Sequence, residues 1–120
     1  MTDYSDNQSW LHESGYNLSQ KKDEDGFANL NPWDRLIYCL WIADFGIRKE
    51  GSLSAAMNMY EDFQTEGKRA AQELSLRHCH KSFSLAPEEF GECFLENINT
   101  LCDEVRKARQ ISEAFIDPRR

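Results

Sequence analysis

The sequence predicts an all-α protein, with a single compact domain of about four helices packed around a central apolar helix. Three observations support this fold class. Apolar residues recur at spacings of three and four in several segments, no segment alternates apolar and polar residues as a half-buried strand would, and 120 residues can enclose one hydrophobic core. We expect a flexible acidic arm over residues 1–26, a helical domain over residues 27–115 and a short basic tail over residues 116–120.

The first 26 residues differ in composition from the rest of the chain. They contain six acidic residues and two lysines, they are rich in Ser, Asn and Gln, and their apolar residues follow no clear period. This composition is typical of a flexible arm. The apolar residues that could dock a short piece of the arm onto the domain are Trp10, Leu11, Tyr16 and Leu18. The segment lacks the basic and apolar regions of a secretory signal, so we expect a cytoplasmic protein.

The stretch NPWDRLIYCLWIADFG, which begins at Asn31, predicts the central helix over residues 32–48. Asn31 is suited to cap its N-terminus and Pro32 to occupy its first turn. Apolar residues follow on almost every face, which is typical of a buried helix. The apolar run is far shorter than the roughly 20 residues of a membrane-spanning helix, so we expect no membrane segment. Gly46 or Gly51 is expected to end the helix.

The middle of the chain predicts one helix with a weak point. Ser52 or Ser54 is suited to cap its N-terminus, and the apolar residues that follow recur at spacings of three and four. We expect Gly67 to weaken or break this helix, which then resumes over residues 68–78. A loop is expected over residues 80–86, which read HKSFSLA.

Pro87 is expected to begin the longest helix, with Glu88 and Glu89 favourably placed in its first turn. At about 100° per residue, one face of this helix is apolar and another is acidic. The apolar stripe consists of Phe90, Phe94, Ile98, Leu101, Val105 and Ala108.

The sequence contains no catalytic motif. It has no P-loop, no glycine-rich dinucleotide fingerprint and no nucleophile elbow. General acid–base catalysis needs a carboxyl group in an apolar setting, and Asp44, beside Trp41 and Phe45, is the only acid so placed. The remaining acids resemble solvated helix faces. We therefore predict that the protein is not an enzyme and needs no cofactor.

The four cysteines form no C-x-x-C pair, and we expect them to be reduced thiols packed in the core. Cys79 lies between His78 and His80, which brings three metal-ligand types together. Structural zinc sites usually combine two short-spaced pairs of ligands, and the chain has no second pair. We therefore predict no metal site, while a metal- or thiol-dependent protein centred on Cys79 remains an alternative.

The formal net charge of −7 argues against direct binding to nucleic acids or anionic membranes and favours a basic protein partner. Acids on one face of a rigid helix lie roughly 5–6 Å apart, and such an array can steer a basic surface toward it. We predict two acidic groups that bind the partner, one on the last helix and one in the middle of the chain. They are Glu89, Glu92, Glu96 and Asp103, and Glu61, Asp62 and Glu66.

The segments LIYCLWIADFG, RKEGSL and AAMNMYEDF together resemble a family of small helical bacterial proteins of largely unknown function. The resemblance covers roughly residues 30–105. Where the family pattern has an Asn-Gly-Gly-Phe-like turn, this chain has KEGSL over residues 49–53 and lacks the Asn and one Gly. One family member is described as an acidic DNA mimic that binds a DNA-binding regulator. In size and charge the chain also resembles bacterial immunity proteins, which cover the basic active site of a toxin.

These patterns predict a non-enzymatic acidic protein that neutralises a basic partner, as a bacterial immunity protein inhibits its toxin. The alternative is a DNA mimic that sequesters a DNA-binding regulator. A homodimeric structural module is a further possibility.

Overall fold

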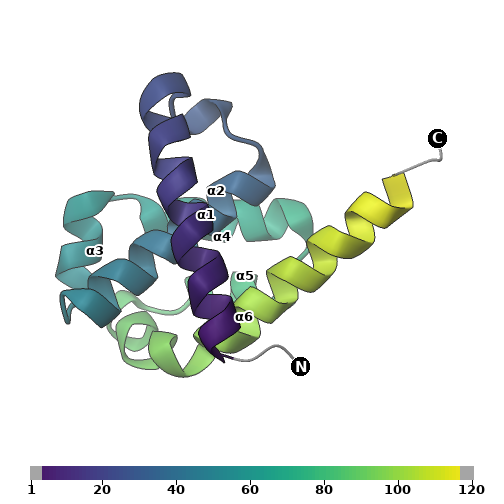
Figure 1. Ribbon diagram of the computed structural model, residues 1–120. Helices are drawn as coiled ribbons and strands as arrows, with labels where there is room; N and C mark the ends of the chain where they lie inside the picture. Colours follow the sequence, from purple (N-terminus) through teal and green to yellow (C-terminus); the bar gives the residue numbers. More distant parts are fainter. Residues whose placement is uncertain (1–3, 117–120) are drawn as a thin grey trace.

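The structure is a computed structural model that describes residues 4–116 (Figure 1). These residues contain six α-helices and no strand, which confirms the all-α prediction, although about four helices were expected. The helices are α1 (Tyr4–Asp25), α2 (Pro32–Asp44), α3 (Leu53–Met59), α4 (Phe63–Leu74), α5 (Arg77–Phe83) and α6 (Pro87–Ile116). None of these helices has the length and apolarity that a membrane crossing requires. Apart from its first residue, the predicted basic tail lies outside the described residues.

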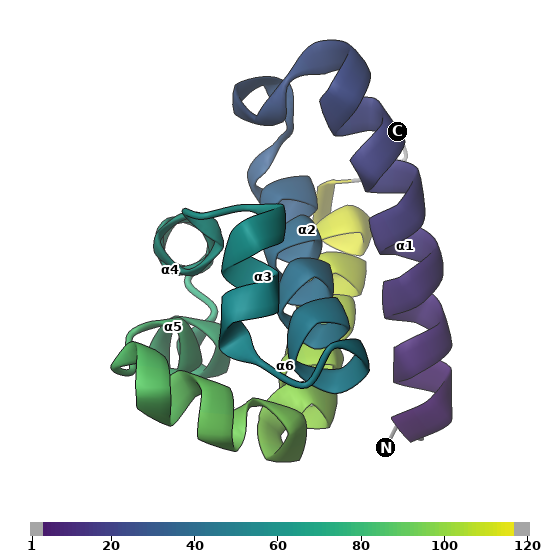
Figure 2. The same ribbon diagram turned by 90° about the vertical axis from the view of Figure 1, so that its left-hand side faces the viewer.

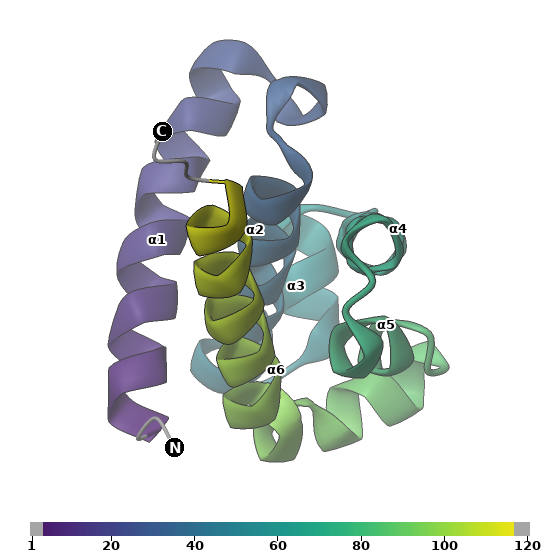
Figure 3. The ribbon, with the colours of Figure 1, turned by 90° about the vertical axis from the view of Figure 1, so that its right-hand side faces the viewer.

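Helix α2 is the central element, as predicted. The Asn31 side chain accepts a hydrogen bond of 2.8 Å from the backbone N–H of Asp34, and Pro32 occupies the first turn. Most of the helix is buried, because α1, α3, α4 and α6 all pack against it (Figures 2 and 3). The α-helix ends at Asp44, and the chain then makes one wide π-helical turn over Phe45–Lys49. Gly51 follows this turn with a φ of 82°, a conformation that glycine adopts without strain.

The middle of the chain is divided differently from the prediction. Ser52 caps α3 by accepting from the backbone N–H of Ala55 at 3.2 Å, as expected. The interruption follows at residues 60–62, whereas Gly67 lies inside α4. Gly67 is buried against the ring of Phe83, and a Cβ atom there would lie 2.6 Å from the ring. Its role is therefore to let α4 and α5 approach closely.

The loop expected over residues 80–86 is only partly a loop, because α5 extends to Phe83. The N-terminus of α5 is capped from a distance. The carboxylate of Glu104 in α6 accepts hydrogen bonds from the backbone N–H groups of His78 and Cys79, at 2.9 and 2.8 Å. A cap supplied by a residue 25 positions away leaves no local pattern in the sequence.

Helix α6 begins at Pro87, as predicted, and its apolar stripe faces the core. The rings of Phe63, Phe83 and Phe94 surround Phe90, with centroids 5.3 to 5.8 Å from its own. Figures 2 and 3 show that α6 changes direction. Its first turns run across the lower end of the molecule in these views, and the remaining turns run upward beside α1 and α2. The helix therefore presents its faces to different neighbours along its length.

The flexible arm predicted over residues 1–26 is not confirmed, because residues 4–25 form helix α1, packed on α2 and α6. One face of α1 is buried and carries residues at spacings of four, four and three. The face consists of Asn7, Leu11, Gly15 and Leu18. Only two of these side chains are apolar, which explains why the sequence shows no apolar period here.

Polar contacts hold both ends of α1. Near its start, the buried Asn7 amide donates to Asp103 at 2.9 Å and to the side chain of Asn99, and it accepts from Arg106 at 2.8 Å. Near its end, the Lys22 ammonium lies 5.7 and 5.5 Å from the ring centroids of two tyrosines, Tyr38 and Tyr60. These contacts replace the apolar residues that a helix of this length would ordinarily bury.

Candidate functional site

Six exposed carboxylates lie just before α4 and in the first three turns of α6, and we refer to these residues as the acidic end. The two helix starts lie together because the rings of Phe63 and Phe90 are 5.8 Å apart and the Gln64 amide donates to the carbonyl of Leu85 at 2.7 Å. The acidic end consists of Glu61, Asp62, Glu88, Glu89, Glu92 and Glu96. Among the described residues, none of these six carboxylates forms an ion pair within 4.0 Å.

Two of the predicted partner-binding residues make contacts within the chain. Asp103 is half-buried under α1 and accepts the hydrogen bond from Asn7. Glu66 is half-buried and pairs with Arg69 of the next helical turn at 2.7 Å. The prediction for Asp103 treated α6 as a straight helix with one free acidic face, whereas α1 covers that face beyond residue 96.

Exposed apolar side chains accompany the acidic end. Leu95, between Glu92 and Glu96 in the chain, is 40% exposed. Met57 and Met59 are also exposed on α3, which contacts the first turns of α6. These side chains are aliphatic, so apolar anchoring here does not depend on aromatic rings.

Cys79 has none of the geometry of a reactive thiol. Its side chain is fully buried, and the thiol donates to the carbonyl of Leu101 at 3.7 Å. Burial raises the pKa of the Cys79 thiol well above its usual value, and the nearby Glu104 carboxylate adds to this increase. Within the described part of the chain, no three His, Cys, Asp or Glu side chains are placed to hold a metal ion.

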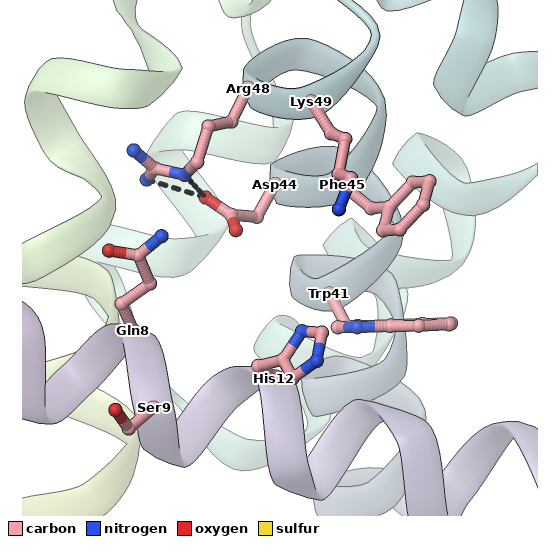
Figure 4. Close-up of a pocket in the computed structure, with 8 residues that line it drawn as sticks. All are labelled: Gln8, Ser9, His12, Trp41, Asp44, Phe45, Arg48 and Lys49. Atoms are coloured by element: carbon pink, nitrogen blue, oxygen red, sulfur yellow. Dashed lines mark hydrogen bonds and ion pairs between the residues drawn. The ribbon is translucent and has the colours of Figure 1, made fainter.

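A cleft of about 380 Å³ lies between α1 and the segment from α2 into the π turn (Figure 4). Asp44 lines this cleft, but it is not an isolated acid in an apolar pocket. One of its oxygens accepts from the Nη2 and Nε groups of Arg48, at 2.7 and 3.0 Å. The cleft is lined by Gln8, Ser9, His12, Trp41, Asp44, Phe45, Arg48 and Lys49.

The position of Trp41 depends on Gly15. The indole packs so closely on α1 that a Cβ atom at Gly15 would lie 2.0 Å from its Cγ. The indole Nε1 is buried and has no hydrogen-bond partner. The cleft was not predictable from the sequence, because three of its eight lining residues come from α1, which was expected to be an arm. The spacing of Asp44 and Arg48, one helical turn apart, was the only local signal.

No family model, curated protein or solved structure matches this chain. The resemblance to small helical bacterial proteins therefore stays a hypothesis. We infer the function from the structure of this chain.

Proposed function

We propose that the protein is a non-enzymatic acidic binding protein of the cytoplasm, which neutralises a basic partner protein as an immunity protein inhibits its toxin. The observation that carries this proposal is the acidic end. Six exposed carboxylates, just before α4 and in the first three turns of α6, have no ion-pair partners among the described residues, and the starts of the two helices are in contact through Phe63 and Phe90.

The acidic end would act in two stages. Its carboxylates would first attract a basic surface over a distance of about 10 Å at moderate salt, which speeds the encounter. Leu95, Met57 and Met59 would then lose their exposed apolar area against the partner. Methionine side chains suit this second stage because they adapt to the shape of a partner.

A DNA mimic would use the same carboxylates against a different partner, a DNA-binding regulator. The two functions differ in what the partner otherwise binds. A regulator held by its DNA-binding surface would be released by duplex DNA in competition, whereas a toxin held at its active site would lose enzymatic activity in the complex.

The test compares proteins captured from the source cells by three forms of the full chain. The first is the wild type and the second is Glu92→Lys/Glu96→Lys, which reverses two of the exposed charges on α6. The third, Glu13→Lys/Glu24→Lys, makes the same change in charge on exposed positions of α1. We expect one basic protein to be held by the first and third forms and lost from the second.

Binding of that protein is then measured at increasing salt. We expect the second form to associate about tenfold more slowly at low salt and to depend less on salt than the wild type does. Equal binding by all three forms would contradict the proposal, because the acidic end would then contribute nothing specific.

A further inference from the structure

We propose that the cleft between α1 and the π turn after α2 is a binding site for a small aromatic carboxylate. This inference does not depend on the acidic end, because the two regions share no residue.

The cleft has the size and construction of a small-molecule site. Its volume of about 380 Å³ falls within the usual range for such sites, roughly 300–1,000 Å³. Figure 4 shows side chains from both elements around one space: Gln8 and His12 from α1, and Trp41, Asp44 and Arg48 from the opposite side. Packing of Trp41 on Gly15 fixes the separation of the two walls at this point.

Trp41, which lines the cleft, has a buried donor without an acceptor. Its Nε1 group makes no hydrogen bond within the part of the chain that the structure describes. Buried N–H groups are nearly always paired, since an unpaired one costs the free energy of its lost hydration. Because this atom is covered, a ligand oxygen would supply the missing acceptor only after the side chains over the indole edge move aside.

The charges that line the cleft favour an anion. Arg48 and Lys49 are basic, in a chain whose net charge is −7. The only acid in the lining is Asp44, and its carboxylate is already neutralised by Arg48. An added carboxylate would therefore meet net positive charge and N–H donors.

The apolar part of the lining favours a flat ring. The rings of Trp41 and Phe45 lie 5.9 Å apart, and the Lys49 ammonium lies 5.8 Å from the centroid of the Phe45 ring. An aromatic ligand can pack on these rings while its carboxylate reaches the ammonium group of Lys49. This combination selects an aromatic carboxylate over an aliphatic acid or a neutral ring.

The experiment titrates the ¹⁵N-labelled full chain with 2-naphthoate and follows the indole N–H signals of its three tryptophans. Trp41→Phe identifies the signal of Trp41. We expect that signal to shift and saturate, while those of Trp10 and Trp33 change little. The neutral isostere 2-naphthamide should bind about fivefold more weakly, since hydrogen bonds to charged groups are the stronger.

Two lysine variants test the charge term. Lys49→Gln should weaken the binding of 2-naphthoate about two- to fivefold, because the lysine is exposed and its contribution is screened. Lys68→Gln makes the same change at an exposed position of α4 outside the cleft and should leave the affinity unchanged. The proposal is overturned if the Trp41 signal does not saturate by about 10 mM 2-naphthoate. It also fails if 2-naphthamide binds equally well or the two lysine variants have the same affinity.

Discussion

Single polar residues that the sequence presents as surface groups hold this fold together. Asn7 is 1% exposed and joins three residues of α6 through its amide. Glu104 caps α5 by accepting from two backbone N–H groups. Buried polar groups stabilise a fold when they are paired and cost free energy when they are not. Both residues therefore act as structural joints, and the joint at Asn7 includes Asp103, one of the acids predicted to bind a partner.

Tyr38 couples the stability of the protein to alkaline pH. Burial, with smaller contributions from Cys39 and Asp23, raises the pKa of Tyr38 from 10.0 to about 12. The folded protein keeps this proton where the unfolded chain releases it. The stability that depends on it is therefore complete below pH 10 and is lost as the pH rises toward 12. Burial also raises the pKa values of Tyr60 and Cys102 to about 12, so they add to the same loss.

We expect Tyr38→Phe to reduce this alkaline loss, since phenylalanine has no proton to release. Between pH 8 and pH 11, the variant should lose about 1 kcal/mol less of its free energy of unfolding than the wild type. Urea unfolding at the two pH values measures the difference. Equal losses in the two proteins would show that Tyr38 titrates in the folded state as it does in the unfolded chain.

Among the helices, α1 offers the most direct test of the packing, because its position depends on contact between Gly15 and Trp41. Gly15→Ala would place a methyl group against the indole, whereas Gly91→Ala in α6 meets its nearest atom, Leu53 Cβ, at an ordinary 3.6 Å. Both changes gain about 1 kcal/mol of helix propensity. We expect Gly91→Ala to be stabilising and Gly15→Ala to lower the free energy of unfolding by about 1–3 kcal/mol, because overpacking exceeds that gain.

Urea unfolding of the two glycine variants measures this difference against the wild type. If both variants proved more stable, Gly15 would not be in close contact with Trp41. The cleft between α1 and α2 would then not be closed at that point.

Helices α2 and α6 were predictable because their own residues carry the information. Asn31 and Pro32 mark the start of α2, and an uninterrupted apolar stripe marks α6. Helix α1 was not predictable in this way, since Asn7 and Gly15 occupy half of its buried face. Likewise, the exposed acids at the two helix starts could be predicted from composition. The cleft could not, because it forms only when α1 lies against α2.

At the scale of the whole molecule, the ion pairs are unevenly distributed. The net charge is −7, and the described residues contain four ion pairs, none of them at the acidic end. Like charges that lie close together in the folded state repel one another and lower its stability. The carboxylates that would attract a basic partner therefore also lower the stability of the free protein, because they repel one another.

We expect the midpoint of thermal unfolding to rise by a few degrees when sodium chloride is increased from about 0.01 to 0.3 M, since salt screens this repulsion. The rise should be smaller in Glu92→Lys/Glu96→Lys than in Glu13→Lys/Glu24→Lys, because only the first pair relieves the acidic end. Differential scanning calorimetry measures all three proteins. A midpoint that is constant or falls with salt would show that the carboxylates are too far apart to repel.

The joint between Asn7 and α6 also fixes an order of events during synthesis. Its partners lie 92 to 99 positions further along the chain, so it closes one of the longest loops that this sequence can form. Gly15 can meet Trp41 as soon as α2 has been made, yet Asn7 has no partner until Arg106 has emerged. The start of α1 can therefore be fixed only after the helices between α1 and α6 have been synthesised.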